Sequence, residues 1–178
     1  MVKPLEKESR PVPLTRRCAK MSDHKSTGIV SKEDIEIPSE ERLEEKPVVI
    51  IECVENIPCD PCVAACHKDA ISMDEITDIP DIDFDKCIGC GLCVTECPGL
   101  AIFVLDCSYS DEKCKVTVPY EYLPVPEEGD EVMALDRKGD EIQKAVVTNV
   151  RESGKTYGIT IELDKEHAMN VRGLEVIE

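Results

Sequence analysis

The stretch that decides the fold reads Cys87-Ile88-Gly89-Cys90-Gly91-Leu92-Cys93-Val94-Thr95-Glu96-Cys97-Pro98. Its cysteines follow the spacing Cys-x2-Cys-x2-Cys-x3-Cys, and a proline comes directly after the last one. Gly89 and Gly91 stand between the cysteines, where the loop must bend tightly and aim backbone N–H groups at sulfur. Pro98 cannot donate a hydrogen bond, and it fixes the turn that sends Cys97 away from the loop. The spacing therefore predicts three thiolates on one curled loop and a fourth that serves a different site.

An internal repeat places a second copy of this pattern upstream. Three cysteines and an Ala-Ile pair recur at an offset of 31 residues: Cys59, Cys62 and Cys66 as Cys90, Cys93 and Cys97, and Ala70-Ile71 as Ala101-Ile102. Self-similarity over five positions indicates a duplicated structural unit. Each copy is predicted to run from a cysteine-bearing loop through a short helical turn into an apolar strand, over 70–73 and over 101–105. The two copies predict a pseudo-symmetric module.

The redox state of the eleven cysteines decides what they do. No apolar run of signal-peptide length occurs in residues 1–32, and Arg16-Arg17 is not followed by a hydrophobic stretch. No segment approaches the roughly 20 apolar residues of a membrane span. We therefore expect a cytoplasmic protein, whose clustered thiols are metal ligands and not disulfides. Zinc knuckles and thioredoxin-like chemistry fit less well, because each copy has more cysteines than a CxxC pair and no βαβ pattern surrounds them.

These residues resemble the bacterial-type ferredoxins with two [4Fe–4S] clusters, over about 55 of the 178 residues. The resemblance implies that each cluster takes ligands from both copies. It assigns one cluster, here called the second cluster, to Cys66, Cys87, Cys90 and Cys93. The other, the first cluster, would be held by Cys59, Cys62, Cys97 and a residue 31 positions before Cys87.

That last position is occupied by Asn56, which departs from the family pattern. An amide is a poor ligand for a soft iron–sulfur site, which selects thiolate. Cys53 can complete the first cluster if the loop between Cys53 and Cys59 bulges outward. The alternatives are a three-iron cluster without a fourth ligand, a missing first cluster, or another ligand.

Several further residues lie outside the repeat. His67 stands where the family usually has proline; the turn tolerates it, or its imidazole couples the cluster to protonation. Cys107 and Cys114 are expected to be ordinary thiols flanking an exposed turn, where they could cover a cluster. With Cys18 as the only further thiolate, a third metal site is the weaker interpretation.

The composition divides the chain into three zones and an α+β fold. Residues 1–47 are predicted to form an extended, partner-contacting arm with short helical turns at 31–34 and 39–42. Residues 48–114 form the two-cluster ferredoxin-like module. Residues 115–178 are predicted to form a small antiparallel β-barrel-like docking module. Its strands are expected over 129–135, 145–150, 157–163 and 174–177, with turns at 137–140 and 153–154.

The net charge of −17 excludes a nucleic-acid-binding surface, which needs a basic face. An acidic redox carrier can be steered onto a basic rim around a partner's cofactor. No Ser-His-Asp group, phosphate loop or paired carboxylates can be placed, so the chain is not expected to be an enzyme by itself.

The strings Ile57-Pro58-Cys59-Asp60-Pro61-Cys62 and Pro98-Gly99-Leu100-Ala101-Ile102 also resemble ferredoxin-type subunits of FAD-dependent amine or amino-acid (proline-type) dehydrogenases. That resemblance implies flavoprotein (FAD) partner subunits, with room for other iron–sulfur subunits in the same complex. This chain would relay electrons through two [4Fe–4S] clusters. A free ferredoxin shuttle and a redox-sensing iron–sulfur protein are the alternatives.

Overall fold

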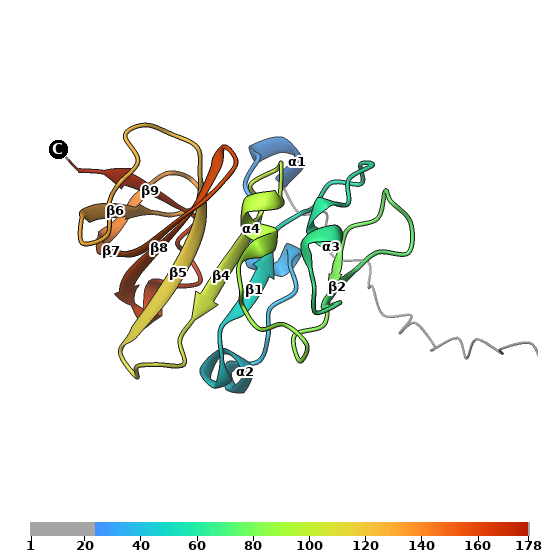
Figure 1. The fold of residues 1–178 in the computed structure, drawn as a ribbon, viewed down its shortest axis with the longest axis horizontal. Helices are drawn as coiled ribbons and strands as arrows, with labels where there is room; N and C mark the ends of the chain where they lie inside the picture. Colours follow the sequence, from blue (N-terminus) through green and yellow to red (C-terminus); the bar gives the residue numbers. More distant parts are fainter. Residues whose placement is uncertain (1–23, 178) are drawn as a thin grey trace, which may run out of the picture.

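The computed structural model of the chain describes residues 24–177 and is organised around one seven-stranded antiparallel sheet (Figure 1). The helices and turns of 3-10 helix are α1 (His24–Thr27), η1 (Lys32–Asp34), α2 (Glu40–Glu45), α3 (Pro61–Ala65), α4 (Leu92–Glu96) and η2 (Lys165–His167). The strands are β1 (Val48–Ile51), β2 (Ile71–Ser72), β3 (Asp81–Ile82), β4 (Ile102–Asp106), β5 (Lys113–Tyr120), β6 (Glu131–Leu135), β7 (Glu141–Ser153), β8 (Thr156–Asp164) and β9 (Gly173–Val176). The large sheet has the order β1-β4-β5-β8-β7-β6-β9, and β2 pairs with β3 separately.

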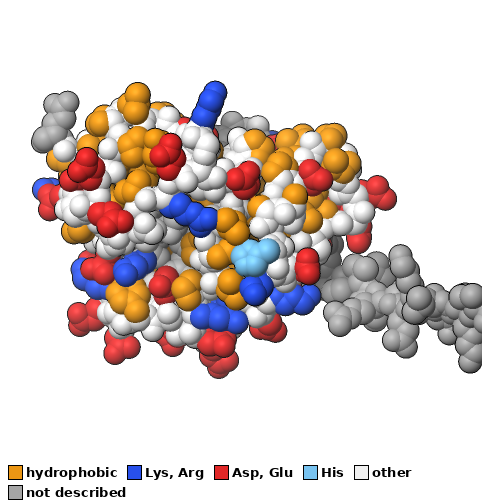
Figure 2. Space-filling model, viewed as in Figure 1, with side chains coloured by type: hydrophobic (Ala, Val, Ile, Leu, Met, Phe, Trp, Pro, Cys, Tyr) orange, Lys and Arg blue, Asp and Glu red, His pale blue; other side chains and the backbone are white. Residues whose placement is uncertain are grey.

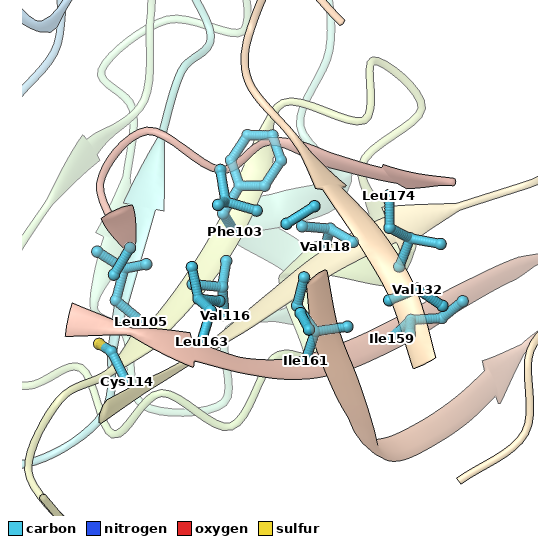
Figure 3. Packing of buried hydrophobic residues seen from close by; sticks show 14 of the residues in the cluster. Phe103, Leu105, Cys114, Val116, Val118, Val132, Ile159, Ile161, Leu163 and Leu174 are labelled. Atoms are coloured by element: carbon cyan, nitrogen blue, oxygen red, sulfur yellow. The ribbon is translucent and has the colours of Figure 1, made fainter. Parts of the chain in front are cut away.

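Strands β1 and β4 separate two hydrophobic cores. Successive side chains of a strand point to opposite faces, and β4 places Phe103 and Leu105 in one core and Ile102 and Val104 in the other. The first core, here called the tail core, is built mainly from β5 and the C-terminal strands (Figure 3). The second, here called the cysteine core, contains the buried cysteines Cys62, Cys87 and Cys93. The cysteine-bearing region and the C-terminal strands therefore both pack against β1 and β4.

The duplicated unit is present as the sequence predicts. Each copy places a helix of five residues after its loop, α3 in one and α4 in the other, and then an apolar strand, β2 or β4. Helices α3 and α4 pack against each other. The predicted order of helix and strand is therefore present in both copies, and the pseudo-symmetric relation between them stays a prediction.

The C-terminal strands lie where they were expected, but they do not close into a barrel. Strands β6, β7, β8 and β9 match the four predicted strands, and the turns at 137–140 and 153–154 connect them. The expectation of a barrel-like module is wrong, because β5 pairs with β4 on one side and with β8 on the other. That pairing extends the sheet toward β1 and leaves β1 and β9 as its two ends. Strand β5 also spans the predicted boundary between residues 114 and 115.

The described part of the arm carries both predicted helical turns. At η1, the Ser31 backbone N–H donates to the Asp34 carboxylate at 2.9 Å. At α2, the Ser39 hydroxyl accepts from the backbone N–H of Arg42 at 3.2 Å. Residues 1–23, with Cys18, lie outside the described residues.

The surface mixes charged and hydrophobic side chains. On the face shown in Figure 2, Asp and Glu side chains are spread widely and hydrophobic side chains lie between them. Within residues 24–177, the structure contains no helix with the length and apolar character needed to span a membrane.

Candidate metal centre

The first group of cysteines surrounds a cavity of about 350 Å³. The four cysteines that line it are the predicted first-cluster set: Cys53, Cys59, Cys62 and Cys97. Cys62 lies in α3 and Cys97 follows directly on α4, so the packing of the two helices brings both copies of the repeat to one cavity. Cys53 arrives from the loop after β1.

Asn56 does not contribute to this cavity. Its side chain is exposed, and its amide donates to the carbonyl of Thr77 at 3.2 Å. Cys53, by contrast, is among the residues that line the cavity. The structure thus brings Cys53 and not Asn56 to the three other thiols, while the assignment of Cys53 as an iron ligand stays a prediction.

The second group of cysteines lines a much narrower cavity of about 20 Å³. Its members are Cys66, Cys87, Cys90 and Cys93, again drawn from both copies. The backbone N–H of Ala70 donates to the Cys66 sulfur at 3.3 Å. His67 also borders this cavity, at the position where the family pattern would have proline.

The two glycines of the Cys87–Cys93 loop have the conformations that the spacing predicts. Gly89 and Gly91 adopt φ values of +63° and +73°, in the left-handed region that favours glycine. A Cβ at Gly89 would lie only 2.4 Å from Cβ of Pro47. Gly89 therefore allows the loop to pass closely over the segment that enters β1.

Burial and the proximity of other thiols raise the pKa values of Cys62 and Cys93. The pKa of Cys62 rises to about 11, first because of burial and then because of repulsion from Cys97. The pKa of Cys93 rises to about 12, again first because of burial and then because of Cys87, Cys90 and Cys66. In an empty site these thiols stay protonated at neutral pH, and a bound metal must displace the protons.

Two arginines from outside the repeat donate hydrogen bonds to backbone carbonyls at the second site. Arg42, a buried residue of α2, donates to the Cys87 carbonyl at 2.9 Å and to the Phe84 carbonyl at 2.8 Å. Arg151, from the β7–β8 hairpin, donates to the Cys90 carbonyl at 2.9 Å. Sequence reasoning missed both arginines, because their partners lie 45 and 61 residues away and no local spacing connects them.

Cys107 and Cys114 form a disulfide, which corrects the expectation of ordinary thiols. The pairs Leu105–Val116 and Asp106–Lys115 set the β4–β5 register, which makes Cys107 and Cys114 the next facing pair. Their Cα atoms are 4.4 Å apart, within the range that a disulfide spans. Both side chains are buried in the tail core, so they do not cover a cluster site.

The donor set of the first cavity fits an iron–sulfur cluster. Four thiols around one apolar-walled space provide the soft ligands that such clusters require. Within residues 24–177, no three or more His, Cys, Asp or Glu side chains are close enough to hold a single metal ion. A cluster needs more room than one ion, because iron and sulfide fill the space between its thiolates. When bound, such a cluster supplies one-electron redox chemistry, and the residues of this chain hold and orient it.

Comparison with known proteins agrees with this chemistry. Residues 52–101 match the family model of the 4Fe-4S dicluster domain. Over 53 residues, 30% of this chain, the sequence is 43% identical to the polyferredoxin-like subunit of an aliphatic sulfonate oxidoreductase from Pyrococcus furiosus. Over 54 residues, also 30% of the chain, it is 39% identical to an NrfC homologue from Haemophilus influenzae. Over 46 residues, or 26%, it is 41% identical to the pyruvate synthase subunit PorD from Methanothermobacter marburgensis.

Each of these similarities covers less than a third of the chain. The matched stretch spans 28% of the Pyrococcus protein, 24% of the Haemophilus protein and 51% of the Methanothermobacter protein. No solved structure matches the chain. The segment 52–101 is therefore similar to iron–sulfur ferredoxin-type domains, and the match to the family model does not extend to the arm or to the C-terminal strands.

Proposed function

We propose that the chain is an iron–sulfur electron-transfer subunit of an oxidoreductase complex, which relays electrons through two [4Fe–4S] clusters. The observation that carries the proposal is the grouping of eight cysteines into two sets of four, each drawn from both copies of the repeat. One set would be Cys53, Cys59, Cys62 and Cys97, and the other Cys66, Cys87, Cys90 and Cys93. The packing of α3 against α4 keeps the two sites close, which suits transfer from one cluster to the next.

The partners would be redox subunits, among them a flavoprotein. Two of the similar proteins are named as subunits of an oxidoreductase and of a synthase, which supports a role inside a complex. The short strings around Cys59 and Pro98 favour FAD-dependent amine or amino-acid dehydrogenases as the class of complex. The chain would then carry electrons in the cytoplasm while the flavin subunit performs the substrate chemistry.

The net charge of −17 supports a basic partner surface. Opposite charges on two protein surfaces speed the encounter of the proteins and orient them toward each other. They also make the association depend on salt concentration. We therefore expect the affinity for the partner subunit to fall as ionic strength rises.

Anaerobic affinity purification from the native host tests the proposal. We expect about eight irons and eight acid-labile sulfides per chain, the content of two [4Fe–4S] clusters, together with co-purifying subunits that contain flavin. A lone monomer with the same iron content would favour the free ferredoxin shuttle. An oxidant-labile first cluster with a regulatory partner would favour the redox sensor, and zinc in place of iron would overturn all three.

A further inference from the structure

Glu52 occupies an unusual position beside the first site. It comes directly after β1 and immediately before Cys53, and its side chain is only 7% exposed. Its backbone N–H donates to the carbonyl of Ala101 at 2.8 Å, which continues the β1–β4 pairing by one step. Glu52 also borders the cavity of the first site. The start of the loop that carries Cys53 is thus fixed at Glu52.

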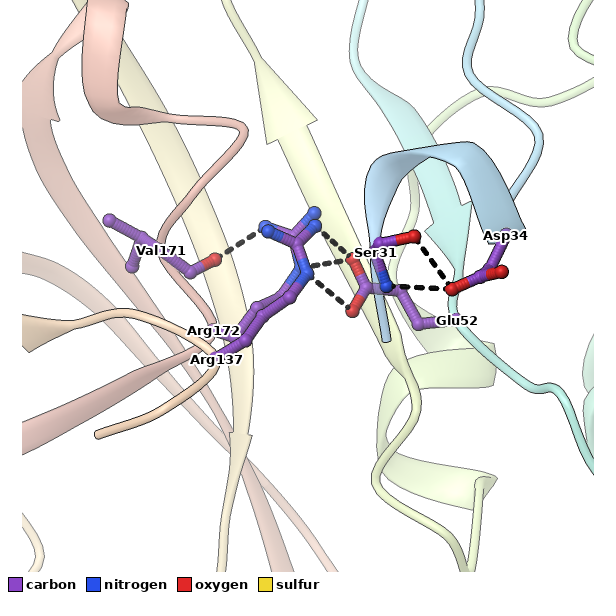
Figure 4. A network of polar contacts seen from close by, with 6 residues as sticks. All are labelled: Ser31, Asp34, Glu52, Arg137, Val171 and Arg172. Atoms are coloured by element: carbon purple, nitrogen blue, oxygen red, sulfur yellow. Dashed lines mark hydrogen bonds and ion pairs between the residues drawn. The ribbon is translucent and has the colours of Figure 1, made fainter. Parts of the chain in front are cut away.

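Two arginines from the far end of the chain hold the Glu52 carboxylate (Figure 4). Arg137 donates to it through Nε at 3.1 Å and through Nη2 at 2.5 Å. Arg172 donates through Nε at 2.5 Å. The two guanidinium groups lie 85 and 120 residues from Glu52 in sequence, and they reach it from the β6–β7 turn and from the segment before β9.

This network contains more positive than negative charge. Burial lowers the pKa of Arg172 to about 10, against the opposing effect of Glu52, so Arg172 remains charged at neutral pH. Within the described residues, its Nη2 atom is buried without a hydrogen-bond partner. Its guanidinium lies 4.7 Å from the centroid of the Phe103 ring, and Phe103 lines the cavity of the first site. A buried excess of positive charge is costly unless a negative group compensates it.

A cluster held by four thiolates is such a negative group. We infer that Arg137 and Arg172 are positioning residues for the first cluster. By holding Glu52 they fix the loop that brings Cys53 to the first cluster, and their excess positive charge favours the reduced state of the first cluster. The inference rests on the proposed function and adds to it a role for the C-terminal strands.

The test uses the full chain and Arg137, the more exposed of the two arginines, at 13% against 5%. Arg137→Gln removes the positive charge and both hydrogen bonds to Glu52. Arg137→Lys keeps the positive charge, but its amine cannot form the two-point hydrogen bond of a guanidinium group. Lys165→Gln is the matched control, because the Lys165–Glu44 ion pair at 2.8 Å also ties the C-terminal part to the arm without contacting a cysteine loop. Electron paramagnetic resonance during redox titration follows each cluster separately.

We expect Arg137→Gln to lower the reduction potential of the first cluster and to raise its three-iron fraction after brief air exposure at least twofold. The second cluster and the Lys165→Gln protein should match wild type. Arg137→Lys should keep the wild-type potential of the first cluster and show a three-iron fraction between those of wild type and Arg137→Gln. If Arg137→Gln does not fold, a three-iron fraction in Arg137→Lys above that of wild type is the deciding result. A first cluster unchanged in potential and three-iron fraction, or equal shifts in both clusters, would overturn the inference. A wild-type chain without two clusters would instead overturn the proposed function.

Discussion

Cys53 is the residue on which the first site depends most. It lies three positions before Asn56, where the repeat would place a cysteine, and it borders the first cavity together with Cys59, Cys62 and Cys97. The repeat identifies six of the eight cysteines, and the Cys-x2-Cys-x2-Cys-x3-Cys spacing adds a seventh, Cys87. Neither pattern fixes the eighth, because the shape of the 53–59 loop depends on contacts such as that of Asn56 with Thr77.

Cys53→Ser should convert the first cluster to a three-iron form. Loss of the thiolate leaves one iron without a soft ligand, so the iron content falls and a three-iron signal replaces the [4Fe–4S] signal. Iron analysis and electron paramagnetic resonance on anaerobically purified protein measure both. Asn56→Ser is the control and should keep both clusters; a cluster loss in Asn56→Ser with an intact Cys53→Ser protein would reverse the ligand assignment.

Gly89→Ala should destabilise the chain far more than Gly154→Ala. Both glycines have φ +63°, so both variants bear the left-handed strain of about 1–2 kcal/mol. At Gly154 a Cβ meets nothing within 4 Å, whereas at Gly89 it would collide with backbone and side-chain atoms of Pro47. We expect Gly89→Ala to lower the free energy of unfolding by an additional amount on the order of 1–3 kcal/mol. Anaerobic urea unfolding measures the difference, and equal midpoints would contradict the close approach.

Cluster retention should weaken as the pH falls from 8.5 toward 6. The pKa values of Cys62 and Cys93 are raised above the ordinary value of 9.0, so protons compete with iron for these sulfurs throughout this range. Each thiol that binds iron as a thiolate releases its proton, and lower pH therefore favours the protein without its clusters. The amount of iron retained against a fixed chelator concentration, measured at several pH values in this range, checks the direction of the pH dependence. Retention that is independent of pH would show that proton release does not limit binding.

At the scale of elements, the sequence predicted what depends on local pattern. Loop, helix and strand recur in both copies because the cysteine spacing and the apolar runs recur, and the predicted strands β6 to β9 alternate or end at turn residues. Strand β1 was not predicted, because the uninterrupted apolar run Val48–Ile51 has no period. Its four residues are buried because the run lies between the tail core and the cysteine core, which only the tertiary fold reveals.

The Cys107–Cys114 disulfide should stabilise the β4–β5 hairpin without affecting either cluster. It closes a short loop, with a sequence separation of 7, which corresponds to about 2–3 kcal/mol in the chain-entropy model. Cys107→Ala/Cys114→Ala should lower the free energy of unfolding by that order and keep the wild-type iron content. Thiol titration of the denatured wild-type chain, with and without reductant, establishes whether the bond is present. A loss of iron in the double variant would show that this pair contributes to the cluster region.

At the scale of the molecule, the C-terminal strands are part of the structure that holds the cysteines. The sheet runs without interruption from β1 to β9, and Arg137, Arg151 and Arg172 reach back from it to the cysteine loops or to Glu52. Composition suggested separate zones because the cysteines end at Cys114. It could not show that the pairing of β4 with β5 joins them, because strand pairing over long sequence distances leaves no local signal.

Removal of residues 113–178 should therefore prevent the cysteine-bearing part from holding its clusters. The truncation exposes the hydrogen-bonding edge of β4 and uncovers Ile50, Phe103 and Leu105, which the tail core buries. An open apolar edge of this kind promotes aggregation. The measurement is the soluble yield and iron content per chain after anaerobic expression. The control is a full chain cleaved beside Tyr122, which is 72% exposed, because cleavage there keeps every strand present. We expect the cleaved protein to retain its iron and the truncated one to lose it; a soluble, monomeric chain of residues 1–112 with about eight irons would show that the ferredoxin-type part folds independently.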